Sequence, residues 1–171
     1  MHEILDVYNE KKEVTGKTIR RGIDKLKDGE YRLIVDAIIV NDNNKILISK
    51  RSKSKKHLPL LWECNGGSVR SGENSKEAII REIKEELGLQ LDFGFGKLLF
   101  TDIIKEDFKI RDVYVFYKNF DINEVKFTDN EVCDAKYVNI DEFKKMYENG
   151  EMTDNSTYVI NHWEEVLKGR I

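Results

Sequence analysis

The sequence has little cysteine, little proline and no long apolar run. Its 171 residues hold only two cysteines, Cys64 and Cys133, which are far apart and form no CxxC pair. A disulfide framework is therefore not expected. Because no secretory signal is visible either, we expect a cytoplasmic protein whose two cysteines are reduced, small buried hydrophobes. The single proline and the absence of low-complexity tracts argue against disorder.

An excess of one charge is also lacking. Charged residues make up 36% of the chain, yet they nearly cancel to a net charge of −3. This balance gives no overall attraction to a nucleic acid polymer or to an anionic membrane, so we expect neither as a partner. No apolar run approaches the roughly 20 residues needed to cross a bilayer.

The order of apolar segments predicts an α/β fold with a mixed β-sheet covered by helices on both faces. The run 31–40 is rich in β-branched residues, which predicts a strand buried on both faces, and it forms a predicted hairpin with 45–51. Further strands are expected at 3–8, 95–104, 111–120 and 135–140, and helices at 75–87 and 139–147. We expect one domain over 1–171, made of an N-terminal extension (1–30), a core (31–150) and a C-terminal helix (151–171).

The helix predicted at 75–87 has a signal at each end. Asn74 is the expected N-cap, with Glu77 completing a capping box, and Gly88 is the expected residue just after the C-terminus. At about 100° per residue, an apolar arc faces the sheet. This arc consists of Ile79, Ile80, Ile83 and Leu87.

Three glutamates near the end of this helix pose a physical problem. Glu82, Glu85 and Glu86 lie on a neighbouring arc, where they repel one another and the negative end of the helix dipole. A local rule broken in this way is expected mainly at functional sites. A divalent cation such as Mg²⁺ or Mn²⁺, which prefers oxygen ligands, would remove the repulsion. The alternative is a solvated acidic face offset by Arg81 and Lys84.

The same stretch resembles the Nudix box of the MutT-like hydrolases. That motif runs Gly, five residues, Glu, seven residues, Arg-Glu, an aliphatic residue, any residue, Glu-Glu, any residue, Gly and an aliphatic residue. Every position is met, by Gly67, Glu73, Arg81, Glu82, Ile83, Glu85, Glu86, Gly88 and Leu89. The resemblance implies a Nudix-type α/β/α sandwich. It also implies a pyrophosphohydrolase that cleaves the diphosphate linkage of a nucleoside diphosphate derivative or a related small organic diphosphate.

The resemblance also assigns roles within and near the box. It implies that Glu82 and Glu86 bind the metal ion, joined by Glu85 and the carbonyl of Gly66. Arg81 would orient a box glutamate and Glu73 would brace the preceding loop, while Gly67 and Gly88 complete the structural motif. The general base differs between family members, and both Glu85 and Glu131 are candidates here.

A basic segment, SKSKKH at 52–57, suggests a phosphate clamp next to the box. Arg51 offers a bidentate fork and Lys55 a point charge. The stretch 50–62 resembles the corresponding part of isopentenyl-diphosphate isomerase and of the Nudix hydrolases similar to it. In that isomerase the matching Arg and Lys bind diphosphate. The alternative is a solvated, flexible loop.

Two other functions share the implied fold. An isomerase of isopentenyl-diphosphate type would need a cysteine and a histidine where alignment from Gly72 places Gly66 and Ser68, with Cys64 two residues away. A non-catalytic ligand-binding module would not need the full acidic set. We therefore expect the hydrolase. No proline follows Leu89, so the patterns that identify Nudix subfamilies are missing. The substrate and the oligomeric state, a homodimer included, stay open.

Overall fold

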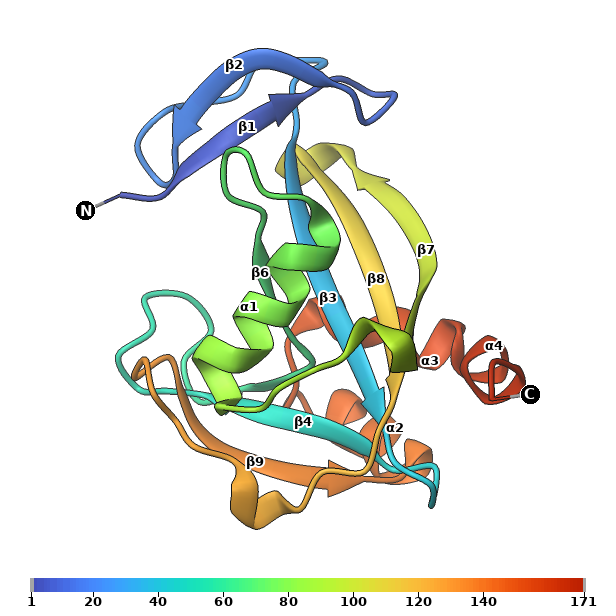
Figure 1. Cartoon of the computed structure of the whole chain (residues 1–171). Helices are drawn as coiled ribbons and strands as arrows, with labels where there is room; N and C mark the ends of the chain where they lie inside the picture. The colour runs from blue at the N-terminus through green and yellow to red at the C-terminus, as the bar shows by residue number, and fades with distance from the viewer. Residues whose placement is uncertain (1, 171) are drawn as a thin grey trace.

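A parallel pair of strands forms the centre of the molecule (Figure 1). In this computed structural model, described for residues 2–170, β3 (Arg32–Val40) runs alongside β8 (Lys109–Tyr117) in one continuous register. The sheet order is β5-β4-β3-β8-β7, with β6 added to β3 and β9 to β4. These strands are β4 (Ile46–Arg51), β5 (Trp62–Glu63), β6 (Asn65–Ser68), β7 (Gly96–Ile104) and β9 (Val132–Val138). All pairs except β3–β8 are antiparallel, which makes the sheet mixed.

Strand β3 changes partner along its length on one side. Its last residues, Ile39 and Val40, pair with β4, whereas Ile34–Ala37 pair with β6. The predicted hairpin between β3 and β4 therefore exists but is short. The short strands β5 and β6, which sequence patterns did not predict, fill the opening where the two longer strands diverge. As a result the glycine-rich segment is part of the sheet, and it lies under the acidic helix.

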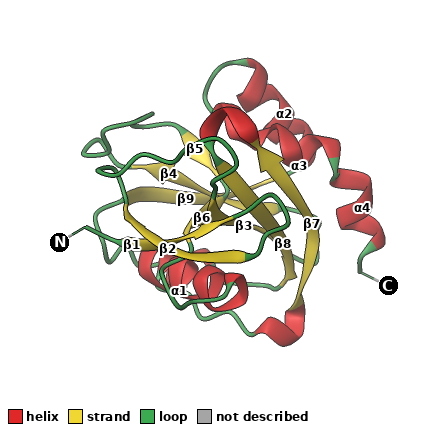
Figure 2. Cartoon of the chain, turned by 90° about the horizontal axis from the view of Figure 1, so that it is seen from above, coloured by secondary structure: helices red, strands yellow, loops and turns green. Residues whose placement is uncertain are grey.

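Helices cover both faces of the sheet (Figure 2). On one face α1 (Ser75–Leu87) packs on the side chains of Leu33, Val35 and Ala37. On the other face lie α2 (Ile140–Glu148), α3 (Thr157–Asn161) and α4 (Trp163–Lys168), which share a core cluster with Ile38 and Val40. The alternating side chains of β3 thus enter two cores, as its β-branched composition predicted. This arrangement confirms the α/β/α sandwich.

The N-terminal hairpin forms a separate two-stranded sheet. Strands β1 (Ile4–Tyr8) and β2 (Val14–Arg20) pair antiparallel. They attach to the main body through reciprocal backbone hydrogen bonds between Tyr8 and Tyr31, at 2.8 and 2.9 Å. The hairpin lies over the end of α1 at which that helix begins (Figure 1). Residues 21–30, which follow β2, form turns and irregular backbone.

The C-terminal segment corrects one expectation. Instead of a single helix over 151–171, α3 and α4 are separate, and His162 between them has φ −108° and ψ 11°, outside the helical region. The apolar side chains of the two helices still enter the core, because Val159, Trp163 and Val166 are all buried. Short 3-10 turns at Phe93–Phe95, Lys105–Asp107, Ile122–Glu124 and Asp154–Ser156 complete the connections. Within residues 2–170, no helix has both the length and the apolar character needed to cross a membrane.

Candidate active site

The ends of α1 are where sequence chemistry placed them. The Asn74 side chain accepts hydrogen bonds from the backbone of Lys76 and Glu77, and the Asn74 N–H donates to the Glu77 carboxylate at 2.9 Å. Gly88 closes the helix in the left-handed conformation, with φ 67°. The helix therefore spans Ser75–Leu87, the predicted range, and its register fixes where the glutamates point.

The glycines of β6 are required by close contacts and not by unusual dihedral angles. A Cβ atom at Gly67 would lie 2.3 Å from the carboxyl carbon of Glu82, and one at Gly66 would lie 2.1 Å from the carbonyl oxygen of Val35. Strand β6 is thus pressed between α1 and β3. This contact places the Glu82 carboxylate directly against the backbone of the glycine strand.

Two of the three helix glutamates are buried. Glu82 is 8% exposed and Glu86 is 7% exposed. Burial raises the pKa of Glu86 well above its ordinary value, and the nearby carboxylates of Glu82 and Glu63 raise it further. Among residues 2–170, Glu86 forms neither a hydrogen bond nor an ion pair with any side chain. A buried carboxylate without a partner is strongly unfavourable when ionised, so this position calls for a cation.

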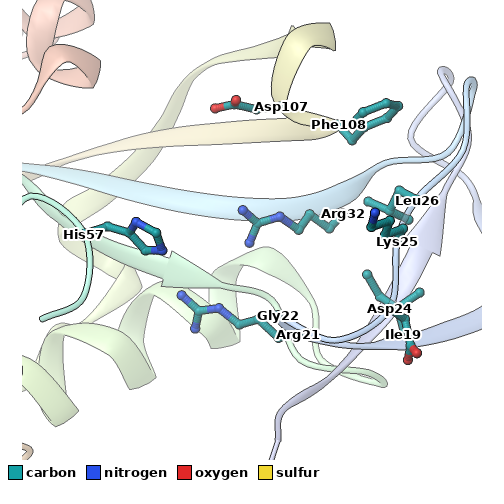
Figure 3. Close-up of a pocket in the computed structure, with 10 residues that line it drawn as sticks. All are labelled: Ile19, Arg21, Gly22, Asp24, Lys25, Leu26, Arg32, His57, Asp107 and Phe108. Atoms are coloured by element: carbon teal, nitrogen blue, oxygen red, sulfur yellow. The ribbon is translucent and has the colours of Figure 1, made fainter.

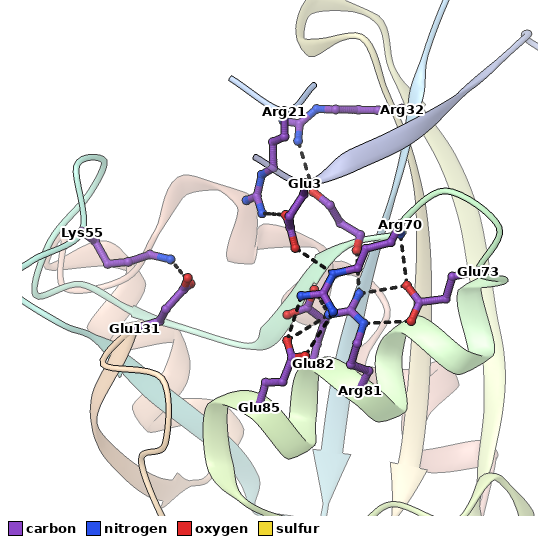
Figure 4. A network of polar contacts seen from close by, with 11 residues as sticks. Glu3, Arg21, Arg32, Lys55, Arg70, Glu73, Arg81, Glu82, Glu85 and Glu131 are labelled. Carbon is purple, nitrogen blue, oxygen red and sulfur yellow. Dashed lines mark hydrogen bonds and ion pairs between the residues drawn. The ribbon is translucent and has the colours of Figure 1, made fainter. Parts of the chain in front are cut away.

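Arg81 is the centre of a network that joins the helix to the preceding loop (Figure 4). Its guanidinium donates two hydrogen bonds to Glu73, at 2.8 and 2.9 Å, and one each to Glu82 at 2.8 Å and Glu85 at 3.0 Å. It also donates to the carbonyl of Ser68 at 2.9 Å. Burial alone would raise the pKa of Glu73, but the hydrogen bonds from the Arg81 side chain and the Arg70 backbone, together with the charges of both arginines, lower that pKa. Arg81 therefore holds the loop and two helix glutamates in fixed positions.

Arg70 adds a second layer to this network. It contacts Glu85 through both terminal nitrogens, at 3.2 and 3.3 Å, and Glu3 of the N-terminal segment at 2.9 Å. Glu3 in turn accepts a hydrogen bond from Arg21 at 2.6 Å. The N-terminal hairpin is therefore connected to the acidic helix by charged contacts.

A cleft of about 420 Å³ collects the predicted site residues. The walls include every residue predicted for metal binding, catalysis or substrate binding, namely Arg51, Lys55, Gly66, Glu82, Glu85, Glu86 and Glu131. Of the predicted structural motif, only Gly67 lines the cleft, because Glu73, Arg81 and Gly88 support it from behind. The predicted site residues from four separate parts of the chain thus meet at one surface.

The two predicted clamp residues are engaged with the protein itself. The Lys55 ammonium forms an ion pair with the Glu131 carboxylate. Arg51 donates to Glu63 at 2.7 Å and to the carbonyls of His57 and Leu58 at 2.8 and 3.0 Å. Arg51 consequently shapes the basic loop as well as facing the cleft. A bound diphosphate would compete with the carboxylates of Glu63 and Glu131 for these cations.

The carboxylates of Glu82, Glu85 and Glu86 and the Gly66 carbonyl are suitable ligands for a hard divalent cation, although their oxygen atoms do not surround one point in this structure. Within the described residues 2–170, no three His, Cys, Asp or Glu side chains are arranged to hold a metal ion. The reason is visible in the network, because Arg81 and Arg70 hold Glu82 and Glu85. Carboxylates and a backbone carbonyl are the ligands that Mg²⁺ and Mn²⁺ prefer. The unpartnered Glu86 provides the strongest single indication that such an ion fits.

Several residues of the cleft were missed by sequence reasoning. Arg70, Glu63 and Cys64 line it, as does Asp36, whose pKa burial raises to about 7 against the opposing effect of Arg111. Asp36 carried a usable signal, since it is the one charged residue inside the apolar stretch 33–40. Cys133, expected to be buried, is exposed instead.

Comparison with known proteins agrees with this geometry. The family described as "NUDIX domain" matches residues 30–157. An uncharacterized Nudix hydrolase of Listeria monocytogenes is 35% identical over 150 residues, covering 87% of each chain. The crystal structure of DR0079 from Deinococcus radiodurans superposes with a TM-score of 0.76 at 25% identity, over 93% of this chain and 98% of that one. The Nudix domain of Shewanella oneidensis NrtR, solved with ADP-ribose, shares the fold with a TM-score of 0.64 at 16% identity, over 87% and 94%.

Proposed function

The chain belongs to the Nudix family of pyrophosphohydrolases, and on that premise we propose that it cleaves the diphosphate linkage of a small organic diphosphate with the help of Mg²⁺ or Mn²⁺. The observation that carries the metal dependence is Glu86, a buried carboxylate without a protein partner, beside the buried Glu82. Glu82, Glu86, Glu85 and the Gly66 carbonyl would hold the ion. When bound, such an ion neutralises phosphate oxygens and lowers the pKa of a coordinated water.

The remaining side chains of the cleft have separate tasks. Arg51 and Lys55 bind and orient the diphosphate. In doing so, Arg51 gives up its contact with Glu63 and Lys55 its contact with Glu131, and phosphate oxygens take the place of these carboxylates. Arg81 and Arg70 act as positioning residues, because they hold the helix glutamates and the loop at a fixed separation. No movement of the sheet is required for any of these steps.

Glu131 is the better of the two candidate bases. Its side chain forms one ion pair, with Lys55, and a substrate phosphate would draw Lys55 away and leave the carboxylate free. Glu85, by contrast, is held by three hydrogen bonds from Arg70 and Arg81. The oxygens of Glu85 are thus already engaged as hydrogen-bond acceptors and are not free to face a water molecule. Glu131→Gln should therefore lower kcat more than KM, with a change in the pH profile of kcat.

A panel of diphosphates with Mg²⁺ and with Mn²⁺, run in ¹⁸O-labelled water, tests the function. ADP-ribose is the first probe because a Nudix domain of the same fold binds it. We expect cleavage of at least one diphosphate, loss of cleavage with EDTA, and one ¹⁸O atom in one of the two phosphate products. Cleavage that is unaffected by EDTA would contradict the metal dependence, and label found in neither phosphate would contradict attack of water at phosphorus.

A further inference from the structure

A second hollow of about 530 Å³ lies beyond the catalytic cleft, and here it is called the distal pocket. It lies between the end of β2, the turns after it, the start of β3 and the loop at His57 (Figure 3). Its walls are made by Ile19, Arg21, Gly22, Asp24, Lys25, Leu26, Arg32, His57, Asp107 and Phe108. None of the residues assigned to metal binding or catalysis is among them.

The acidic residues of the distal pocket already have cationic partners outside it. Asp24 accepts hydrogen bonds from the side chain of Arg20 at 2.8 and 3.0 Å. Asp107 is paired with Lys109 at 2.7 Å. Each acid therefore already has a cationic partner, and the effect of the Asp107 charge on the pKa of Arg32 is smaller than the effects of burial and of Arg21.

Two basic residues of the distal pocket, Arg32 and Lys25, are not neutralised in the same way. The half-buried guanidinium of Arg32 has one long hydrogen bond, 3.4 Å to the Ser68 hydroxyl, and within residues 2–170 it has no carboxylate partner. Lys25 has no ion pair in that part of the chain either. Burial lowers the pKa of Arg32, and the nearby charge of Arg21 lowers it further. Figure 3 shows the guanidinium groups of Arg21 and Arg32 extending to the same side, toward His57.

Two neighbouring guanidinium groups, of which only one has a carboxylate partner among the described residues, form a site for an anion. Arg21 has Glu3 as its partner, at 2.6 Å, whereas Arg32 has none among the described residues. A partly buried cation without a counter-ion is unfavourable, and planar guanidinium forks match phosphate oxygens in a bidentate geometry. Ile19, Leu26 and Phe108 add an apolar wall that suits a carbon skeleton.

A third hollow shares lining residues with both the distal pocket and the catalytic cleft. This hollow of about 410 Å³ lies between the two, and it shares Arg21 and His57 with the pocket. It shares Arg51, Lys55 and Glu131 with the cleft, which Arg21 lines as well. These shared residues place the distal pocket and the catalytic cleft next to one another along one side of the intermediate hollow.

We propose that the distal pocket binds a further phosphate group of the substrate. The preferred substrates are then organic diphosphates that carry an additional phosphate outside the diphosphate linkage that is cleaved. This inference rests on the proposed hydrolytic function for its substrate, but the anion site exists independently of turnover. Arg32 and Arg21 bind the distal phosphate, Lys25 adds a flexible point charge, and the apolar wall packs on the intervening part of the molecule.

The anion site is tested with inorganic phosphate as the probe. In protein with ¹⁵N-labelled arginine, the Nε–H signals of Arg32 and Arg21 should shift saturably with phosphate, while that of Arg20, outside the pocket, should not. Arg32→Gln should weaken the phosphate response of Arg21 about tenfold, consistent with the loss of one charged bidentate contact. Lys25→Gln, at an exposed position that cannot disturb the fold, should weaken it less, and Lys11→Gln on the far part of the hairpin should leave it unchanged. Two results would overturn the site. One is an Arg32 signal that does not shift with phosphate, and the other is a phosphate response that is weakened as much in Lys11→Gln as in Arg32→Gln.

The substrate assignment is tested by binding, so that it does not depend on turnover. NADP⁺ and NAD⁺ both contain a diphosphate and differ by one phosphate group. We expect the Glu86→Gln protein to bind NADP⁺ about tenfold more tightly than NAD⁺ in calorimetry, and Arg32→Gln in the same background to remove the difference. Inorganic phosphate should compete with NADP⁺. Equal affinities, or phosphate and NADP⁺ bound together, would show that the pocket holds free phosphate and would overturn the substrate assignment. Failure of the proposed hydrolysis would leave both binding results intact.

Discussion

Arg51 illustrates how one side chain serves both the structure and the site. Its guanidinium holds the carbonyls of His57 and Leu58 while it faces the cleft beside Glu63. Arg51→Ala should raise KM by a factor equivalent to about 2–3 kcal/mol, because a partly buried charged contact is lost. Arg51→Lys should recover part of this loss, since it keeps the charge without the fork. Steady-state kinetics measure both effects, and an unchanged KM and kcat in Arg51→Ala would remove Arg51 from the site.

Asp24 lines the distal pocket but forms its charged contacts with a residue outside it, Arg20. Hydrogen bonds from the Arg20 side chain, and then from its backbone, lower the pKa of Asp24 to about 2 from 3.8. Because the folded-state pKa is lowered, the stabilisation is present above pH 3.8 and is lost as the pH falls through about 2. Arg20→Gln should return the pKa of Asp24 toward its ordinary value in an NMR titration of the carboxyl carbon. A value that stays near 2 would assign the shift to a different group.

At the scale of an element, the two glycines that flank α1 form a matched pair. Gly72 and Gly88 both have positive φ, at 80° and 67°. A Cβ at Gly72 would meet nothing within 4 Å, whereas one at Gly88 would lie 3.0 Å from the Cβ of Lys126 and 3.1 Å from its carbonyl oxygen. Gly72→Ala should destabilise by about 1 kcal/mol from backbone strain alone, and Gly88→Ala by about 1 kcal/mol more. Chemical denaturation measures the difference, and equal losses would show that the Lys126 contact relaxes freely.

Helix α1 was predictable from sequence because its determinants are local. The N-cap at Asn74, the apolar arc and Gly88 all act within a few residues, so its limits were predicted correctly. Strands β5 and β6 were not predictable in this way. They are too short for a periodic pattern, and they exist only because β3 and β4 diverge and leave room for them. The break between α3 and α4 at His162 was also not predicted. It depends on how the two helices pack on the sheet, which the helical periodicity of the sequence does not show.

For the candidate active site, the sequence predicted which residues line the cleft but not the ion pairs and hydrogen bonds that they form. The box glutamates, Arg51, Lys55 and Glu131 do line one cleft. The ion pair between Lys55 and Glu131 joins positions 76 residues apart, and the contact between Glu3 and Arg70 joins positions 67 apart. Such pairings follow from the path of the chain in three dimensions, which residue spacing does not encode. The distal pocket was missed because residues 19–32 carry no local motif.

On the scale of the whole molecule, the nearest competing chemistry is alkene isomerisation. Cys64 does line the cleft, between β5 and β6, but burial raises the pKa of its thiol, and the charge of Asp36 raises it further. A thiol kept neutral is a poor proton acceptor. We expect no deuterium incorporation into isopentenyl diphosphate in heavy water with Mg²⁺ or Mn²⁺. Enzyme-dependent incorporation that disappears in Cys64→Ala would favour the isomerase.

The central claim is that the buried glutamates of α1 support metal-dependent diphosphate hydrolysis. The most direct test compares the turnover of Glu86→Gln with that of Glu77→Gln at saturating Mg²⁺, on a diphosphate that the wild type cleaves. Both changes remove one negative charge from the same helix, but Glu77 is exposed and Gln preserves its capping role. We predict a loss of kcat on the order of 100-fold or more for Glu86→Gln and near wild-type turnover for Glu77→Gln. Near wild-type turnover in a folded Glu86→Gln protein would contradict the proposed site.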